Sequence, residues 1–381
     1  MKIVERFVIK YILKIVYGLS HIFSVKKRVV FATYRPDYME GNYKYILEQI
    51  KKENLNLEIK ILYKKPGGGV IGNIKYLLHM CKAEYYLATS SFFIIDDFYF
   101  PVYAMNKLRK GTEVIQVWHA CGAFKKFALS TIDENYSNGN EYIKYVPIHT
   151  NYSYVTVTSE EVAKHYADAF RMSEKNIVPL GAPRTDLFFD EKKKVEVEKE
   201  LYSLYPKLKE KRVILYAPTF RGTGQSNANG GINIDIEKLV NSLDENTVLV
   251  LKMHPFVTWR YKGNDERVID MSDYKSINNI LLITDILITD YSSTIFEFAL
   301  LEKPMIFYAD DLEEYIDDRD FYYNFEELVP GPIVKTTDEL IDILNKGNYD
   351  IEKIKEFKNK FFKYTDGKAS ERLVDKIILK K

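Results

Sequence analysis

The segment ILITDYSSTIFEFALLEKPMIFYADD, from Ile286 to Asp311, carries the local signals of one β-turn-α-β unit. The apolar run Ile286–Thr289 is typical of a buried parallel strand. Helix formers at residues 295–301 follow a hydroxyl-rich turn and precede a proline and a second apolar run. Open parallel sheets bind ligands at the carboxyl ends of their strands, so the turn with Ser292 and Ser293 is a candidate phosphate site. An ordinary capped helix is the alternative interpretation.

Short apolar runs alternate with helical segments along most of the chain, which predicts parallel sheets with right-handed crossovers. The length of 381 residues predicts two domains. We place a Rossmann-like domain at residues 29–190 and a second at residues 205–381, facing a central cleft, with the charged segment 190–201 between them. Strands are predicted at residues 29–33, 58–63, 85–89, 113–117, 154–158, 177–180, 213–216, 247–252, 286–289 and 305–308.

Residues 1–28 predict a basic amphipathic helix, with seven basic residues against the single acidic Glu5. Lys2, Arg6, Lys10 and Lys14 recur at steps of four, which places them along one stripe of a helix. The apolar runs are too short for a transmembrane span of about 20 residues. We expect a helix lying in the plane of an anionic cytoplasmic leaflet, with residues 26–28 as a second electrostatic contact. A helix packed on the protein body, and a true span or signal segment, are the alternatives.

The overall charge excludes a dedicated nucleic-acid binder. Lys and Arg total 55 against 54 Asp and Glu, which gives a formal net charge of +1. Two cysteines form neither a disulfide framework nor a metal cluster by their spacing, which indicates a reduced cytosolic setting. No acidic cluster has clear metal spacing, so we predict no tightly bound metal, with free Mg²⁺ as an optional helper.

Each predicted domain has a histidine immediately after a strand. His119 follows the strand at 113–117, and His254 follows the strand at 247–252. Both are candidate acid/base groups, although a lone histidine at a strand end is often a structural residue. Neither a GxGxxG fingerprint nor a Walker sequence is present. Cationic and hydroxyl side chains suited to a pyrophosphate occur in both halves, which by spacing predicts a transferase that uses a nucleotide-linked donor: Arg184, Arg221, Lys252, Ser292, Ser293 and Arg372.

The motifs at these strand ends, taken in order, resemble the CDP-glycerol glycerophosphotransferase family, the teichoic acid primases and polymerases of Gram-positive bacteria. The resemblance covers about residues 110–375. Its motifs are Trp118-His119 with Gly122 and Lys125-Lys126, Gly181 to Asp186, Tyr216 to Arg221, Lys252 to Pro255, Thr289 to Ser293 with Lys303-Pro304 and Asp310, Phe321-Tyr322, Pro330 to Pro332, and Asp366 to Ser370.

The resemblance implies a GT-B-like α/β fold and the transfer of glycerol phosphate from CDP-glycerol to a hydroxyl of an undecaprenyl-diphosphate-linked saccharide, with release of CMP. His119 matches the family histidine that deprotonates the acceptor, and His254 matches the one beside the donor pyrophosphate. Donor contacts are expected from Arg221, Lys252, Ser292, Ser293, Asp310 and Arg372. Acceptor-side residues are expected to be Gly122, Lys125, Lys126, Arg184 and Asp186.

The compact chain with a basic helix looks more like a primase than a polymerase, peripheral on the cytoplasmic face of the membrane. After His119 the sequence reads Ala-Cys-Gly-Ala-Phe, where other members read Gly-Thr-Pro-Leu, so the acceptor is left open. Three alternatives also stay open: a CDP-ribitol or capsular-polymer polyol-phosphate transferase, a GT-B glycosyltransferase that uses a nucleotide sugar, and a non-catalytic protein that binds a lipid-linked carrier.

Overall fold

The computed structural model describes residues 3–36, 38–132, 146–221, 233–318 and 321–381. The chain divides into two compact units, and each contains a six-stranded parallel sheet. Unit 1 comprises residues 1–121, 126–186 and 368–381, and unit 2 comprises residues 122–125 and 187–367. The predicted pair of Rossmann-like α/β domains is therefore confirmed.

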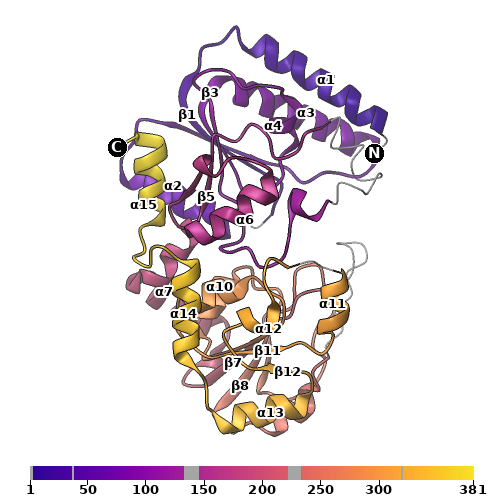
Figure 1. The fold of residues 1–381 in the computed structure, drawn as a ribbon, viewed down its shortest axis with the longest axis vertical. Coiled ribbons are helices and arrows are strands. Elements are labelled where there is room, and N and C mark those ends of the chain that lie inside the picture. The colour runs from indigo at the N-terminus through magenta and orange to yellow at the C-terminus, as the bar shows by residue number, and fades with distance from the viewer. Residues whose placement is uncertain (1–2, 37, 133–145, 222–232, 319–320) are drawn as a thin grey trace. The chain divides into compact units, whose positions relative to one another are not determined.

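The sheet of unit 1 has the strand order β2-β1-β3-β4-β5-β6, and Figure 1 labels its strands β1, β3 and β5. All of its strand pairs are parallel, with Val30 opposite Phe93 and Ile94 opposite Ile115. Since β2 and β3 lie on opposite sides of β1, the direction of winding reverses there, and such a switch point is where open α/β sheets bind ligands. The strands are β1 (Lys26–Thr33), β2 (Glu58–Tyr63), β3 (Ser90–Ile95), β4 (Glu113–Gln116), β5 (Tyr154–Val157) and β6 (Ile177–Pro179).

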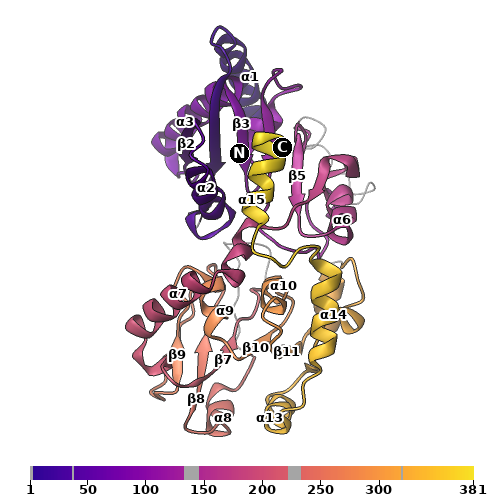
Figure 2. The same ribbon diagram turned by 90° about the vertical axis from the view of Figure 1, so that its left-hand side faces the viewer.

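Helices cover both faces of this sheet. On one face, α2 packs with the C-terminal helix over a core that includes Val29 and Phe31 of β1 (Figure 2). On the other, α3 contacts β1 and β3 and supports α1 and α4. The helices of unit 1 are α1 (Ile3–Ser20), α2 (Asn42–Lys52), α3 (Gly69–Thr89), α4 (Phe100–Ala104), α6 (Glu160–Phe170) and α15 (Ala369–Leu373), which continues as a π-helical turn at Val374–Leu379.

The strand predicted at residues 85–89 is wrong, because these residues form the last turns of α3 and the strand begins at Ser90. Their aromatic and β-branched composition resembles a strand. The buried side chains of α3, however, recur at helical spacing at positions 80, 83, 84, 87 and 88. Packing of that stripe against the sheet outweighs the local strand propensity.

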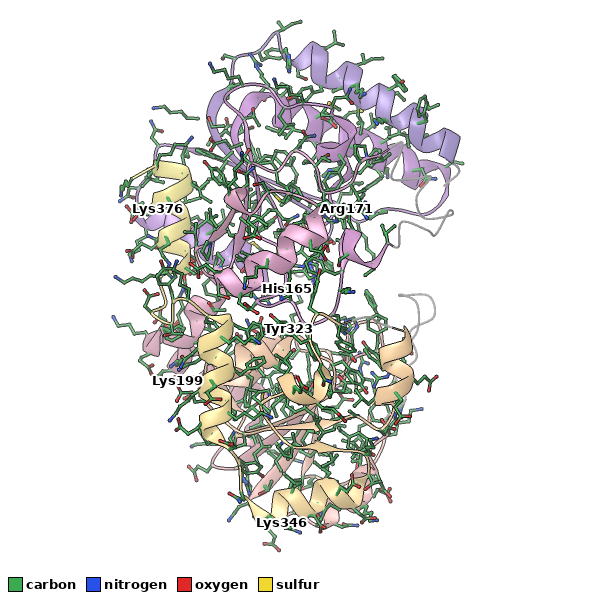
Figure 3. All side chains as sticks on the ribbon, in the orientation of Figure 1. His165, Arg171, Lys199, Tyr323, Lys346 and Lys376 are labelled. Carbon is green, nitrogen blue, oxygen red and sulfur yellow. The ribbon has the colours of Figure 1, made fainter. Side chains whose placement is uncertain are left out.

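The C-terminal segment 368–381, which the sequence analysis assigned to the second domain, belongs to unit 1. Leu373, Val374 and Ile377 are buried in the core beside α2, whereas Lys376 points away from it (Figure 3). The Asp186 carboxylate accepts the backbone N–H groups of Ala369 and Ser370 at 2.8 and 2.9 Å. Burial of this apolar stripe and the cap at its start explain the assignment.

The predicted N-terminal helix is confirmed as α1, which ends at Ser20. It packs on α3 and α4 and buries Leu13 and Tyr17, while Tyr11, Ile15 and Leu19 are exposed. Lys2 lies outside the described residues. No helix in the described part of the chain is sufficiently long and apolar to cross a membrane.

The expected membrane contact at residues 26–28 is wrong for Arg28, which is a buried residue of β1. Its Nε donates to Glu58 Oε2 at 2.7 Å, and its Nη1 donates to Thr89 Oγ1 at 3.1 Å. The guanidinium also lies 4.9 Å from the ring centroid of Tyr86. These partners compensate the buried charge within the protein.

The sheet of unit 2 has the strand order β12-β11-β10-β7-β8-β9, again wholly parallel. Winding reverses between β7 and β10, so the ends of these two strands mark the switch point of this unit. The strands are β7 (Arg212–Tyr216), β8 (Thr247–Leu251), β9 (Val268–Asp270), β10 (Ile286–Thr289), β11 (Met305–Tyr308) and β12 (Ile333–Val334). The predicted strands at 286–289 and 305–308 are confirmed.

Lys199 on α7 and Lys346 at the end of α13 point outward from unit 2 (Figure 3), whereas α10 buries Glu297. The inner faces of the unit 2 helices pack on the sheet, for example through Leu340 of α13 and Leu239 of α8. The helices are α7 (Glu191–Leu204), α8 (Ile236–Asn241), α9 (Ile277–Ile283), α10 (Thr294–Ala299), α11 (Leu312–Asp318), α12 (Phe325–Leu328), α13 (Thr337–Lys346) and α14 (Ile351–Phe361).

A glycine before β12 allows a close approach to β11, and its replacement tests the packing of unit 2. A Cβ at Gly331 would lie 2.1 Å from the backbone oxygen of Met305, so the strand would have to move. We expect Gly331→Ala to destabilise unit 2 by about 1–3 kcal/mol, seen as a lower thermal-unfolding midpoint by circular dichroism. Gly68→Ala is the matched control, because its Cβ meets open space at an ordinary φ of −90°. Equal midpoints for the two variants would contradict the packing argument.

Candidate active site

His119 lies three residues beyond Gln116, the last residue of β4, on a backbone held from several sides. The preceding Trp118 adopts a positive φ of 47°, and its N–H donates to Gln116 Oε1 at 2.9 Å. Asn42, at the start of α2, donates to the Trp118 carbonyl at 2.9 Å. Arg184 donates to the His119 carbonyl at 2.7 Å. The left-handed conformation of Trp118 and these hydrogen bonds fix the backbone position from which the His119 side chain extends.

The hydrogen bond at Nδ1 sets the tautomer of His119. Nδ1 lies 3.0 Å from the carbonyl oxygen of Asp96, and because a carbonyl only accepts, Nδ1 carries the proton. In the neutral ring, Nε2 is therefore the basic nitrogen. Burial lowers the pKa of His119 from its ordinary value, opposed by the carboxylate of Asp97 and reinforced by Arg35. The neutral ring suits the role of a general base.

Three residues beside His119 were missed in the sequence analysis. Arg35 follows β1, and Asp96 and Asp97 follow β3, so all three lie at the switch point of unit 1. The Asp97 carboxylate lies 3.7 Å from His119 Nδ1 and 3.4 Å from Arg35 Nη1. Burial raises the pKa of Asp96 to about 7. The apolar run Phe92–Ile95 followed by two acids was the available signal, and the misplaced strand at 85–89 hid it.

Of the other predicted residues of unit 1, the structure brings Arg184 against His119 and gives Asp186 and Arg372 structural partners elsewhere in the unit. Arg184 contacts the His119 backbone and, through its own N–H, Asn42 Oδ1 at 3.0 Å. Asp186 caps α15. Arg372, predicted to contact the donor together with the residues of the C-terminal domain, instead lies in unit 1 and donates to the Leu180 carbonyl at 2.9 Å. Their proposed substrate contacts stay predictions.

The predicted acceptor-side residues that follow His119 divide between the units. Gly122 and Lys125 belong to unit 2, and Lys126 belongs to unit 1. A Cβ at Gly122 would lie 2.2 Å from the ring of Phe296, so close packing on α10 requires glycine there. Lys125 Nζ donates to the Tyr315 hydroxyl at 2.9 Å and lies over that ring. Lys126 is half-buried.

Arg221 is the centre of an ionic cluster at the switch point of unit 2. Its Nε and Nη2 donate to the two oxygens of Asp311 at 2.6 and 3.0 Å, and its Nη1 donates to Asp290 at 2.8 Å. The guanidinium also lies about 5 Å from the ring centroids of Tyr291 and Tyr315, which stack on each other. Burial alone would lower the pKa of Arg221, but the paired carboxylates outweigh it and raise that pKa. Its charge is thus largely compensated within the unit.

Lys252 and Asp310, two other predicted donor residues of unit 2, have partners of their own. Lys252 is buried after β8 and donates to the carbonyls of Ser272 and Tyr274 at 2.8 and 2.7 Å, and burial lowers its pKa to about 8. Asp310 is exposed and accepts from Asn233 at 2.8 Å, whereas its neighbour Asp311 pairs with Arg221. Sequence reasoning did not single out Asp311 or Asp290.

The turn with Ser292 and Ser293 differs in detail from the predicted cap. Ser292 Oγ accepts the Thr294 N–H at 3.3 Å, and Ser293, the residue before α10, makes no side-chain cap hydrogen bond. The Ser293 hydroxyl is therefore not used to start the helix. Phosphate binding by this turn stays a prediction.

His254 follows β8 and has the opposite tautomer to His119. Its Nδ1 accepts the backbone N–H of Phe256 at 3.2 Å, so in the neutral ring Nε2 carries the proton. The imidazole packs against Phe220 and Phe256, with ring centroids 4.6 and 4.7 Å away. An Nε2–H donor is suited to an oxygen that gains negative charge.

Metal ligation is not evident in the described residues, where no group of three or more His, Cys, Asp or Glu side chains is placed to hold an ion. The expectation that no metal is tightly bound stays a prediction.

The chain is similar over most of its length to proteins of teichoic acid synthesis. It is 42% identical over 351 residues to the teichoic acid ribitol-phosphate primase of Bacillus spizizenii, covering 91% of this chain and 90% of that protein. It is 33% identical over 349 residues to the teichoic acid glycerol-phosphate primase of Bacillus subtilis, covering 88% of each.

Solved structures agree with this. A histidine variant of the wall teichoic acid polymerase TagF, soaked with CDPG, matches with a TM-score of 0.74 at 25% identity, over 93% of this chain and 89% of that one. The fold is thus GT-B-like. A family model described as CDP-glycerol:poly(glycerophosphate) glycerophosphotransferase matches residues 15–379. The chain belongs to this family, the polyol-phosphate transferases of teichoic acid synthesis.

Proposed function

We propose that this enzyme transfers one polyol phosphate from a CDP-polyol to a hydroxyl of a membrane lipid-linked saccharide and releases CMP. The observation that carries the proposal is the pair of strand-end histidines with opposite tautomers, His119 with a basic Nε2 and His254 with an Nε2–H donor. Transfer to a hydroxyl needs both groups, a base for the nucleophile and a donor for the leaving oxygen.

In this proposal one phosphorus–oxygen bond forms and one breaks. The acceptor oxygen forms a bond to the phosphorus that bears the polyol, and its proton passes to His119 Nε2. The bond between that phosphorus and the bridging oxygen breaks, and the oxygen leaves on CMP with its electron pair. His254 Nε2–H donates a hydrogen bond to the charge that develops on the departing phosphate.

The cationic residues of unit 2 then have indirect roles in this proposal. Arg221 and Lys252 are held by carboxylates and carbonyls, so we infer that they shape the loops after β7 and β8 rather than bind phosphate with their full donor sets. Ser292 and Ser293 remain our candidates for donor phosphate contacts, supported by the unused cap position of Ser293. Asp310 remains a candidate for a contact to the donor, from an exposed position.

Ribitol phosphate is the transferred group that the comparisons favour. Identity is 42% to the ribitol-phosphate primase and 33% to the glycerol-phosphate primase, over similar shares of the chain. The CDP-glycerol donor expected from the motifs is the second candidate. The chain is also 41% identical to the teichoic acid poly(ribitol-phosphate) polymerase of Bacillus spizizenii, so identity alone does not separate addition of one unit from polymerisation, and the mass of the product decides between them.

Peripheral binding to an anionic membrane is the last part of the proposal. On α1, Tyr11, Ile15 and Leu19 recur every four residues and are at least half exposed, and Lys10 and Lys14 lie on the same helix. The neighbouring α3 exposes Val70, Ile71, Ile74 and Leu78, with Ile74 exposed by 53%. Two apolar rows beside lysines are typical of helices at a lipid interface.

CMP release tests the reaction directly. We expect CMP from CDP-ribitol, in the presence of a lipid-linked saccharide, to form at least ten times faster than from CDP-glycerol, with a single added ribitol phosphate in the product mass. Faster release from CDP-glycerol would reverse the donor assignment, and a ladder of masses would identify a polymerase. Transfer of a sugar from a nucleotide sugar, with no CMP from either donor, would overturn the proposal.

Variants of the two histidines test their separate roles. Asparagine at position 119 can still donate to the Asp96 carbonyl but offers no base, so we expect His119→Asn to lower kcat by about 100- to 10,000-fold. A glutamine amide reaches the Nε2 position, so His254→Gln should retain more activity than His254→Ala. Stopped CMP assays measure the rates, and calorimetry with the CDP-polyol should find donor binding intact in His119→Asn. Full activity in the double alanine variant would refute the mechanism.

Vesicle flotation tests the membrane surface. We expect the affinity of the double variant Ile15→Glu, Ile74→Glu for phosphatidylglycerol vesicles to fall by roughly tenfold or more, because two apolar side chains that would be buried in the lipid interface are replaced by charged ones. Val195→Glu, an exposed position on α7, is the matched control and should bind like the wild type. The proposed membrane surface would be contradicted if the wild-type protein did not bind anionic vesicles, or if the double variant bound them as well as the wild type does.

A further inference from the structure

A carboxylate not assigned any role so far lies beside the predicted base. Asp97 is the second residue after β3, and its Oδ2 lies 3.7 Å from His119 Nδ1. Its Oδ1 accepts the Phe98 N–H at 2.7 Å, which holds the carboxylate from its other side. The side chain is 25% exposed, and that of His119 is 33% exposed, so water screens the pair only partly.

The backbone of the two strand ends is tied together by one buried amide. Gln116 Nε2 donates to the Asp97 carbonyl at 3.1 Å, and Gln116 Oε1 accepts the Trp118 N–H at 2.9 Å. Gln116 is fully buried at the end of β4, so it sets the spacing between the Asp97 and His119 backbones. The indole of Trp118 stacks on the imidazole with ring centroids 4.4 Å apart, which limits rotation of the ring.

A hydrogen-bonded carbonyl and a nearby carboxylate thus both act on Nδ1, with different consequences. The Asp96 carbonyl, at 3.0 Å, selects the tautomer. The Asp97 carboxylate adds a full negative charge, which favours the imidazolium that forms when His119 takes a proton. A structural carboxylate that only caps Phe98 would have no such effect on the ring.

Resting on the proposed function, we propose that Asp97 is a positioning residue that holds the imidazole of His119 and stabilises its protonated form during proton transfer, and that Arg35 moderates this effect. Arg35 Nη1 lies 3.4 Å from the same Asp97 oxygen that faces His119. Arg35 and the imidazolium form of His119 therefore share one carboxylate, so each cation weakens the attraction of Asp97 for the other.

The charged groups that act on His119 make the expected signs definite. Asp97 raises its pKa, while Arg35 and Arg184 lower it, and the neighbouring Asp96 itself has a pKa raised to about 7 by burial. Removing the Asp97 charge should lower the His119 pKa further. Removing the Arg35 charge should raise the His119 pKa. The two substitutions, one after β3 and one after β1, should therefore shift the His119 pKa in opposite directions.

Paired variants test this proposal in the full-length protein. We expect Asp97→Asn to reduce kcat by about 10- to 100-fold with little change in KM for the donor, because the base is less stabilised when protonated. The acid limb of the kcat profile should move to lower pH by about one unit, and in Arg35→Gln it should move to higher pH. Asp97→Glu should recover part of the rate. Asp338→Asn on α13, an exposed carboxylate of unit 2, is the control.

Two further measurements separate this inference from the proposed function and from misfolding. Histidine-detected NMR titration of the free protein reports the His119 pKa without any substrate, so it stands even if no polyol transfer is found. In a His119→Ala background, Asp97→Asn should cause no added loss of CMP release. Unchanged His119 titration in both Asp97→Asn and Arg35→Gln, shifts of the same sign, or an equal added loss in the His119→Ala background would overturn the proposal.

Discussion

Parallel pairing of the central strands is the constraint on which the chemistry of unit 1 depends. β1, β3 and β4 are neighbours in register, so all three end at one edge of the sheet. The residues that follow them, Arg35, Asp97 and His119, must therefore meet, although they are far apart in sequence. The main-chain carbonyls of Trp118 and Asp97 at this edge need hydrogen-bond donors, and the amides of Asn42 and Gln116 supply them. The geometry of the base is thus a consequence of how the sheet ends.

In unit 2, the polar group at the strand end is compensated mainly by an ion pair and not by side-chain amides. Asp290, directly after β10, is almost fully buried, and an isolated ionised carboxylate there would cost several kcal/mol. Arg221 and the backbone N–H of Thr219, both from the segment after β7, compensate it at 2.8 and 2.9 Å. The two strands that flank the switch point are tied together by this cluster. Because the guanidinium donates to Asp290 and Asp311, its hydrogen-bond donors are largely used within the protein. We therefore expect loss of Arg221 to disturb mainly the loop after β7 and not the binding of phosphate.

Much of the architecture follows from the sequence, because short apolar runs and capped helices are local signals. The unit around residues 286–308 is correct to the residue at both strands. The errors arise where distant contacts decide. Residues 85–89 have strand-like composition, but the buried stripe of α3 extends through them. Residues 373–377 belong to unit 1 and not to unit 2, because their apolar face packs in the core of unit 1. His119 and His254 could be singled out as candidates from their positions at strand ends alone. Asp97 and Asp311 could not be, because their partners are set by register and not by spacing.

The sequence motifs around the two histidines do not determine their tautomers. Each follows a buried strand, and in sequence they are equivalent candidates for acid or base. What separates them is the group that meets Nδ1: a backbone carbonyl for His119 and a backbone N–H for His254. A carbonyl forces the proton onto Nδ1 and leaves Nε2 basic, whereas an amide forces it onto Nε2. The chemistry of each ring is therefore decided by one main-chain group, Asp96 in the first case and Phe256 in the second, and changes at those side chains would leave the assignment intact while a change in loop conformation would reverse it.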